Sequence, residues 1–368
     1  MRRISPYIHQ HPDWPVFTWD HAALEALLGT VRHQQGRLLG QLETLGLDLR
    51  AEATLRTLTL DVLKSSEIEG ELLPPASVRS SIAWRLGLDR AALPAADRRV
   101  EGVVAMLLDA TQQATAQLTA ERLFGWHRAL FPTGYSGMYL LQVGVWRTGP
   151  MQVVSGPLGR ERVHYEAPPA EGLDAQMQQF LAWFNADQGL DPVLKAGLAH
   201  FWFVTIHPFD DGNGRIARAI ADLQLARADG SGQRCFSMSA QIQAERQTYY
   251  DLLESSQRGP LDVTPWLDWF LHCIGRALQA AEQTLAQVLA KARFWERHRQ
   301  TPFTERQRQL LTRLLDGFEG KFTTSKWARM ARCSQDTAGR DVADLVAKGA
   351  LVHEGAGGRS TSYRLAPD

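Results

Sequence analysis

Apolar residues recur at helical spacing along most of this chain. The first such stripe follows Asp20, a residue type that caps helix N-termini, and it consists of Leu24, Leu28, Val31, Leu38, Leu42 and Leu45. The same kind of spacing predicts further helices at residues 47–65, 76–86, 99–117, 119–130, 177–185, 192–206, 216–228 and 245–257. In the tail we expect helices at 290–300, 304–315, 324–331 and 334–348. The predicted fold class is therefore mainly α.

Two segments interrupt the helical pattern. Residues 134–169 are rich in glycine and proline and contain short β-branched runs such as 152–154, which predicts a hairpin or an extended loop. Near the end of the chain, residues 351–353 and 362–365 are joined by a glycine-rich stretch at 355–358. This second pattern predicts another hairpin. A Pro/Ala-rich bend is expected at residues 93–96.

The densest group of chemically useful residues is the stretch 207–218, His-Pro-Phe-Asp-Asp-Gly-Asn-Gly-Arg-Ile-Ala-Arg. Pro208 should end the preceding apolar helix near His207, which leaves an imidazole at a loop mouth, suited to proton transfer near neutral pH. Glycines on either side of an asparagine allow backbone N–H groups to converge on an anion at the start of the next helix. Asp211 is a hard oxygen ligand for Mg²⁺ beside that position.

The same stretch has simpler interpretations. Asp-Gly-Asn-Gly alone is most often a tight turn, and a lone histidine is most often structural. The spacing of the acids does not fit a calcium-binding loop. Arg215 and Arg218, however, are three residues apart and share a helix face, where their guanidinium groups match phosphate oxygens. The combination predicts a polyphosphate site.

Residues 207–218 also resemble the complete signature of the Fic (filamentation induced by cAMP) family. The resemblance implies a protein adenylyltransferase, which moves AMP from ATP to a protein hydroxyl. It implies that His207 is the general base and that Asp211 holds Mg²⁺. It further implies that Gly212, Asn213 and Gly214 form the anion hole, and that Arg215 and Arg218 bind the outer phosphates.

A second motif lies upstream, Ser65-Ser-Glu-Ile-Glu-Gly70, and it resembles the inhibitory motif of that family. By this resemblance, Glu69 pairs with Arg218 and takes it away from the γ-phosphate, with Ser65 as the first residue of the motif. Glu67 and Glu71 are less suited, because the family pattern fixes the glutamate before Gly70. The motif is also compatible with an ordinary helix C-terminus that stops at this glycine.

The resemblance implies three further features. The region 14–88 is similar to the N-terminal helical module of many bacterial Fic proteins. The segment 147–156, which contains Val153, Val154 and Ser155, matches the flap that pins the target by strand addition. Tyr250 and Gln257, seven residues apart on one helix face, are expected beside the adenine.

The tail resembles a winged helix. If it binds DNA, we expect Gln335, Thr337 and Arg340 to face the groove, with Arg359 on the wing. The acidic residues Asp336, Asp341 and Asp344 oppose phosphate contact. Winged helices also serve as docking or dimerisation modules, so a protein partner or a homodimer remains an alternative to DNA.

Composition narrows these hypotheses. The 368 residues suggest three parts, at 1–98, 99–289 and 290–368, and 40 basic against 40 acidic residues give a net charge of zero, with no global attraction to nucleic acid or membrane. Three scattered cysteines argue against a disulfide framework or a zinc site. The absence of a signal-peptide pattern and of long apolar runs predicts a soluble, cytoplasmic protein.

The sequence therefore predicts a mainly α Fic adenylyltransferase, restrained by Glu69, that uses ATP and Mg²⁺ and modifies a target protein or itself. Three alternatives stay open. Glu69 could instead orient water for removal of AMP from a modified protein. The donor could be another phosphate-containing molecule. The Fic site could also serve only to sense nucleotide in a DNA-binding regulator.

Overall fold

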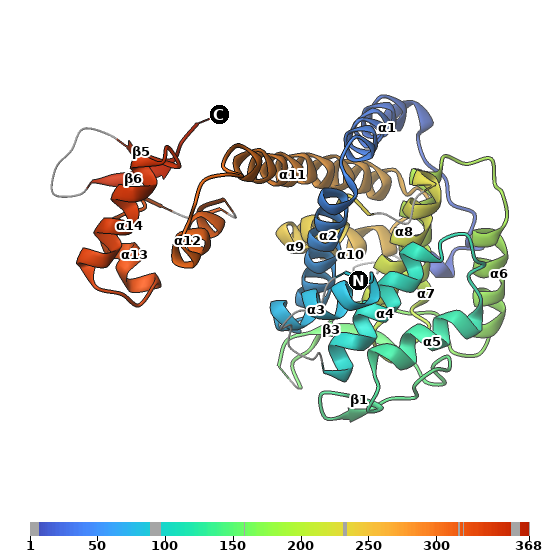
Figure 1. Ribbon diagram of the computed structural model, residues 1–368. Helices are drawn as coiled ribbons and strands as arrows, with labels where there is room; N and C mark the ends of the chain where they lie inside the picture. The colour runs from blue at the N-terminus through green and yellow to red at the C-terminus, as the bar shows by residue number, and fades with distance from the viewer. Residues whose placement is uncertain are drawn as a thin grey trace. The chain divides into compact units, whose positions relative to one another are not determined.

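The computed structural model describes residues 7–88, 97–157, 159–230, 234–315, 317–318, 320–354 and 361–367. These residues form mainly helices, as the sequence predicts, with short hairpins between them (Figure 1). The chain divides into two compact units, Met1–Ala281 and Glu282–Asp368. The bend expected at residues 93–96 lies outside the described residues. No helix among the described residues is long and apolar enough to cross a membrane.

Local signals set the helices of the first unit. Asp20 Oδ1 accepts a hydrogen bond of 3.1 Å from the backbone N–H of Ala23 and thereby caps the first long helix, as predicted. The helical elements of this unit are η1 (Ile8–Gln10), α1 (His21–Glu43), α2 (Leu47–Ile68), α3 (Pro75–Arg85), α4 (Arg98–Gln112), α5 (Ala120–Leu130), α6 (Leu173–Asn185), α7 (Pro192–Ile206), α8 (Asn213–Asp229), α9 (Met238–Ala244) and α10 (Arg246–Gln257).

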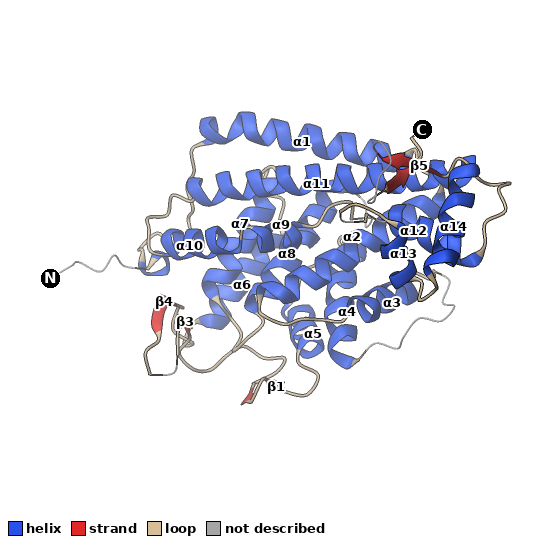
Figure 2. Ribbon diagram, turned by 90° about the vertical axis from the view of Figure 1, so that its left-hand side faces the viewer, coloured by secondary structure: helices blue, strands red, loops and turns tan. Residues whose placement is uncertain are grey.

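Helices α7 and α8 form the centre of this unit. All residues of α7 from Val193 to Ile206 are buried, as expected for a helix that is apolar on every side. Helix α8 packs along α7, and α2, α4, α5 and α9 pack against α8 (Figure 2). The loop between α7 and α8, which holds the first half of the stretch 207–218, therefore connects two largely buried helices.

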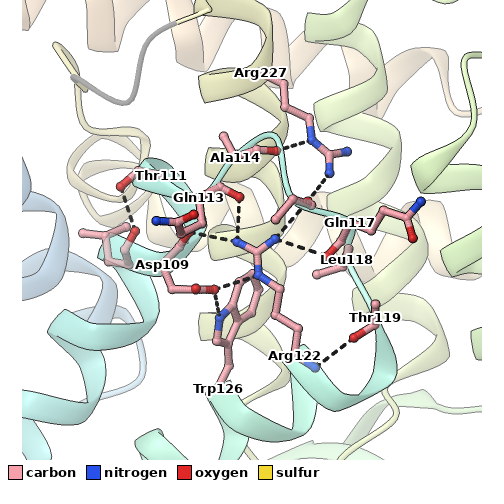
Figure 3. Close-up of polar contacts among 12 residues, drawn as sticks. Asp109, Thr111, Gln113, Ala114, Gln117, Leu118, Thr119, Arg122, Trp126 and Arg227 are labelled. Atoms are coloured by element: carbon pink, nitrogen blue, oxygen red, sulfur yellow. Dashed lines mark hydrogen bonds and ion pairs between the residues drawn. The ribbon is translucent and has the colours of Figure 1, made fainter.

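Hydrogen bonds from two arginines stabilise the connection between α4 and α5. Arg122 Nε donates a hydrogen bond of 2.7 Å to Asp109 Oδ2, and Trp126 Nε1 donates one of 2.6 Å to the same oxygen (Figure 3). Arg227 of α8 donates to the backbone oxygen of Ala114 at 2.5 Å. These bonds tie the C-terminal end of α4 to α8 and so help to hold α8 in place.

The segment 134–169 forms two small hairpins. Strands β1 (Tyr135–Ser136) and β2 (Tyr139–Leu140) pair antiparallel, as do β3 (Gln152–Ser155) and β4 (Arg162–Glu166). Val153 pairs with Tyr165, and Val154 with Val163, so the register shifts and His164 is the extra residue. Such a bulge turns the side chain of the extra residue in a new direction.

Helix α11 (Thr264–Arg297) is longer than the sequence analysis predicts, because only residues 290–300 are expected to be helical there. Its first half has a clear apolar stripe that could have identified it, formed by the buried residues Trp266, Leu267, Phe270, Leu271, Ile274 and Leu278. The short helix α9 was also not predicted.

The second unit contains α12 (Glu305–Leu315), α13 (Thr324–Met330), α14 (Gln335–Ala347), β5 (Leu351–Glu354) and β6 (Ser362–Leu365). The two strands pair antiparallel, as expected from the sequence. Its core includes Leu310, Leu311, Trp327, Val342, Leu345 and Leu351. The helices and hairpin follow the predicted order, and the assignment as a winged helix stays a prediction.

The polar residues of α14 are largely engaged within the second unit. Asp341 accepts hydrogen bonds from Arg306 at 2.5 Å and from Trp327 Nε1 at 3.2 Å, and Asp344 accepts from Lys348 at 2.5 Å. Two of the three carboxylates expected to repel DNA are thus compensated inside the unit. Residue 359, expected on the wing, lies outside the described residues. DNA binding stays one alternative, beside a protein partner or a homodimer.

Candidate active site

His207 lies where α7 ends. The helix stops at Ile206, and His207 takes the left-handed conformation with φ 52° before Pro208, so the predicted helix end is confirmed. His207 Nδ1 lies 3.1 Å from the backbone oxygen of Val204. A carbonyl oxygen only accepts, so Nδ1 must carry the hydrogen of this bond. In the neutral ring, Nε2 is then the atom with a free lone pair, which can take a proton.

The surroundings favour the neutral form of this histidine. Burial lowers the pKa of His207 below its usual value, and the nearby positive charge of Arg147 acts in the same direction. At pH 7 the ring is therefore a base that is ready to accept a proton.

Arg147 also fixes the backbone of the loop. Arg147 is buried, and its Nε donates to the backbone oxygen of His207 at 2.8 Å. The backbone N–H of Arg147 donates to the backbone oxygen of Pro208 at 2.9 Å. From the sequence, this residue was placed only at the start of the segment that matches the flap. The available signal was an arginine directly after the apolar residues Val145 and Trp146.

The turn between His207 and α8 is closed by Asn213. Its Oδ1 accepts from the backbone N–H of Phe209 at 2.9 Å, and its Nδ2 donates to the backbone oxygen of Phe209 at 2.8 Å. Gly212 adopts φ 81°, and a Cβ there would lie 3.0 Å from the ring of Phe131. Glycine meets both demands at this position, the positive φ and the close approach.

The first turn of α8 presents backbone donors. The helix begins at Asn213, and the first N–H groups of a helix have no acceptor inside it. Those of Asn213, Gly214 and Arg215 are thus available to an anion, which the positive end of the helix dipole also attracts. Of the three residues predicted for the anion hole, Asn213 and Gly214 carry such N–H groups, whereas the N–H of Gly212 donates to Asp211 Oδ1. The side chain of Asn213, by contrast, is used to brace the loop.

Asp211 stands beside this turn. Its Oδ2 accepts a hydrogen bond of 2.5 Å from Ser136 Oγ of β1, and its Oδ1 accepts one of 2.6 Å from the backbone N–H of Gly212. Both donors are neutral groups, and they hold the carboxylate beside the first turn of α8. The described residues hold no cluster of three or more His, Cys, Asp or Glu side chains that could bind a metal by themselves.

The structure brings Glu69 and Arg218 together. Arg218 is buried, and its Nη2 donates to Glu69 Oε1 at 2.8 Å and to the backbone oxygen of Ser65 at 2.9 Å. Its Nε donates to Ser65 Oγ at 3.0 Å. Burial alone would lower the pKa of Arg218, but the charge and hydrogen bond of Glu69, together with the nearby Tyr249 and Tyr250, outweigh this effect and raise the pKa above its usual value. This guanidinium is therefore permanently charged and paired.

Gly214 makes room for this carboxylate. A Cβ at position 214 would lie 2.4 Å from Glu69 Oε1 and 3.3 Å from Arg218 Nη1. The carboxylate of Glu69 thus rests against the backbone of the first turn of α8, where the helix offers its free N–H groups. Glu69, the residue predicted to be inhibitory, therefore lies in the position predicted for a phosphate.

A second carboxylate from the same segment reaches the other arginine. Arg215 Nη1 donates to Glu71 Oε2 at 3.1 Å, and the guanidinium lies 5.0 Å from the centre of the Phe131 ring. The sequence analysis treated Glu71 as the less suited glutamate. The available signal was the spacing, since two glutamates flank Gly70 and two arginines are one helical turn apart.

The two residues expected beside the adenine lie on α10. Tyr250 is half-buried, and its hydroxyl donates to the backbone oxygen of Ile68 at 3.5 Å, next to Glu69. Gln257 is buried, and its Nε2 donates to Thr205 Oγ1 at 3.2 Å, two residues before His207. The two side chains therefore contact different helix ends at the site, Tyr250 the end of α2 and Gln257 the end of α7.

The predicted flap residues lie on β3. Val154 and Ser155 are exposed and Val153 is half-buried. Ser155 Oγ lies 2.6 Å from His164 Nε2, and His164 Nδ1 lies 2.5 Å from Glu254 Oε2 of α10. The bulged histidine thus connects the strand to the helix that carries Tyr250, and this fixes the position of the hairpin.

Comparison with known proteins agrees with this geometry. Residues 117–225 match the family model described as Fic/DOC family, and this match contains the whole loop 207–218. This part of the chain is thus similar to Fic/DOC domains. Residues 7–88 match a second family model, a domain of unknown function called DUF4172. Glu69 and Glu71 thus come from outside the Fic/DOC match, as do Tyr250 and Gln257.

Relatives of the Fic/DOC domain bear an enzymatic name. The chain is 35% identical over 131 residues to the protein adenylyltransferase Fic of Culex quinquefasciatus, which covers 34% of this chain and 25% of that protein. It is 27% identical over 223 residues to the protein of the same name from Drosophila grimshawi, which covers 59% and 41% respectively. The chain thus spans less than half the length of these relatives.

One solved structure matches nearly the whole of this chain. The crystal structure of a Fic family protein from Desulfovibrio desulfuricans G20 covers 96% of this chain and 98% of that chain, with a TM-score of 0.56 and 20% identity. At this identity the likeness concerns the fold alone.

Proposed function

We propose that this chain is a protein adenylyltransferase that moves AMP from ATP to a serine, threonine or tyrosine hydroxyl of a target protein or of itself. The observation that carries the proposal is the meeting of three groups at one loop: the free Nε2 of His207, the backbone donors of the first turn of α8, and two arginines. The names of the matching relatives support the same activity.

The arginines have unused donors. Arg215 Nε and Arg218 Nη1 are buried and have no hydrogen-bond partner among the residues that the structure describes. Buried N–H groups without acceptors cost free energy unless a ligand supplies the acceptor. Phosphate oxygens do so for guanidinium groups, which supports a polyphosphate ligand next to Gly214.

The transfer needs a group that accepts the proton of the target hydroxyl and groups that bind the leaving pyrophosphate. The hydroxyl oxygen of the target attacks the α-phosphorus of ATP and forms a P–O bond, while its proton passes to His207 Nε2. The bond from the α-phosphorus to the oxygen that bridges to the β-phosphate breaks, and pyrophosphate leaves. Arg215, Arg218 and the N–H groups of α8 hold the phosphates and compensate the charge that develops.

Asp211 is the residue that fits Mg²⁺ in this arrangement. Mg²⁺ is usually bound through one or two carboxylates together with substrate phosphates, so one charged carboxylate beside the anion site suffices. When bound there, the ion neutralises charge on the phosphate oxygens and helps to orient them. Ser136 and Gly212, which both donate to Asp211, hold the carboxylate in position.

Glu69 restrains the enzyme in the conformation described here. Its carboxylate occupies Arg218 and lies against Gly214, so the outer phosphates of ATP cannot use either at the same time. Relief of this contact should allow ATP to bind in the productive position. The flap strand β3, with Val154 and Ser155 exposed, then offers an edge for the target segment.

The decisive experiment follows transfer of label from α-³²P ATP with Mg²⁺ to protein. Wild type, Glu69→Ala and the double variant Glu69→Ala/His207→Ala are compared, each with and without lysate proteins. Strong labelling in Glu69→Ala that disappears in the double variant is expected. The absence of labelling in every variant would overturn the proposal, and release of AMP from a labelled protein by the wild type would indicate the reverse reaction.

A further inference from the structure

The end of α2 brings two carboxylates to the same helix. Gly70 adopts φ 82°, its N–H donates to the backbone oxygen of Glu67 at 3.0 Å, and the N–H of Glu71 donates to that of Ser66 at 3.0 Å. A left-handed glycine of this kind reverses the chain at a helix end. Glu69 and Glu71, on either side of Gly70, therefore both reach the start of α8.

Each of these carboxylates contacts a different arginine of the phosphate site. Glu69 takes Arg218, and Glu71 takes Arg215 through the hydrogen bond of 3.1 Å. The side chain of Arg215 is only 7% exposed, whereas that of Glu71 is 28% exposed. In an ordinary surface ion pair both side chains are solvated. Here the Arg215 side chain is buried, so this pair differs from an ordinary surface ion pair.

We propose that Glu71 is a second inhibitory residue, which holds Arg215 away from the phosphates as Glu69 holds Arg218. The inference rests on the proposed function, because it assigns Arg215 to the outer phosphates of a nucleoside triphosphate. ATP must then displace two carboxylates to engage both guanidinium groups. Removal of Glu69 alone frees Arg218 and the space beside Gly214 but leaves Arg215 occupied.

Two other roles of Glu71 predict different effects on ATP binding. If Glu71 instead orients Arg215 for the phosphates, its removal weakens ATP binding. If Glu71 only ends α2, its removal changes stability and leaves ATP affinity as it was. The dissociation constant for ATP thus separates the three roles, without any need for transfer activity.

The test compares dissociation constants for Mg²⁺·ATP by calorimetry in the full chain. The Glu69→Ala variant is the reference, and Glu71→Gln and the matched control Glu67→Gln are each added to it. Glu67 lies in the same segment, and its carboxylate contacts Lys64 at 2.6 Å and Gln243 at 3.1 Å. The control removes the same charge and therefore measures the general electrostatic effect. Melting curves check that each variant is folded.

For a partly exposed pair we expect Glu71→Gln to tighten ATP binding about fivefold beyond the control. In a Glu69→Ala/Arg215→Ala background the same substitution should have no such effect, since the partner is gone. Equal affinity with and without Glu71→Gln, or weaker binding, would overturn the inference. Failure of label transfer in all variants would count against the proposed function and leave this binding test intact.

Discussion

Removal of the Glu69 carboxylate should weaken the folded protein and strengthen ATP binding through the same contact. Glu69→Ala is the suitable change, because Glu69 has φ −86° and ψ 5°, which alanine adopts without strain. The variant loses the hydrogen bond of 2.8 Å to Arg218. The guanidinium keeps its bonds to Ser65 Oγ and to the backbone oxygen of Ser65.

The size of the effect follows from the burial of the pair. The side chain of Arg218 is 2% exposed and that of Glu69 is 30% exposed, so the pair lies between a surface and a buried ion pair. A hydrogen bond to a charged group contributes about 1.5–3 kcal/mol. Without ATP, the free energy of unfolding should fall by about this amount. The γ-phosphate no longer competes with the carboxylate, so ATP should bind about 10- to 100-fold more tightly.

Two measurements on the same variants check this linkage. Thermal melting should show Glu69→Ala melting several degrees lower than wild type without nucleotide, at about 2–4 °C per kcal/mol, and the difference should shrink as Mg²⁺·ATP is added. Calorimetry gives the two dissociation constants, with Glu67→Gln as the control for lost negative charge. An unchanged dissociation constant in Glu69→Ala would refute the idea that this carboxylate and ATP compete for Arg218.

Two further predictions concern pH. Burial lowers the pKa of His207. The rate of transfer by Glu69→Ala should therefore be constant near neutral pH and fall about tenfold per pH unit only below pH 6.5. An inflection above pH 6.5 in the pH–rate profile would contradict the assignment of His207 as the base. Burial also lowers the pKa of His127 to about 4 and that of His200 to about 3. The unfolded chain takes up protons below pH 6.5 that the folded chain excludes, so stability should fall between pH 6.5 and 4, by about 2 kcal/mol per histidine at pH 5. Urea unfolding, followed by tryptophan fluorescence, should show a smaller loss in His200→Gln, which can still bond Tyr249; an unchanged pH dependence in that variant would argue against a protonation penalty at His200.

Features with local causes could be predicted from the sequence. The cap at Asp20, the end of α7 before Pro208 and the mainly α fold all follow from residue types near the element concerned. The same holds for the loop 207–218, whose residues meet because they are neighbours in the chain. The contact between Glu69 and Arg218 spans far more sequence, and it was expected only through the family resemblance.

Features with distant causes were missed. Arg147 holds the backbone of His207, which is 60 residues away, and no local pattern around Arg147 indicates that partner. Glu71 meets Arg215 across 144 residues. Gly70 reverses the chain locally, but the contact itself depends on how α2 packs on α8. A periodic pattern identifies an element and its buried face. It does not identify which elements face each other, and that is what decides these two contacts.

The shared use of Gly214 and Arg218 limits how the inhibition proposed for Glu69 can be relieved. The carboxylate of Glu69 lies where a Cβ at position 214 would clash, and it takes the guanidinium that the phosphates need. A change in α8 that repels this carboxylate would therefore also damage the phosphate site. Relief has to come from the other partner, through movement of the C-terminal end of α2. Tyr250 contacts the backbone of Ile68 at that end, so α10 is the neighbouring element through which a bound nucleotide or target can act on it.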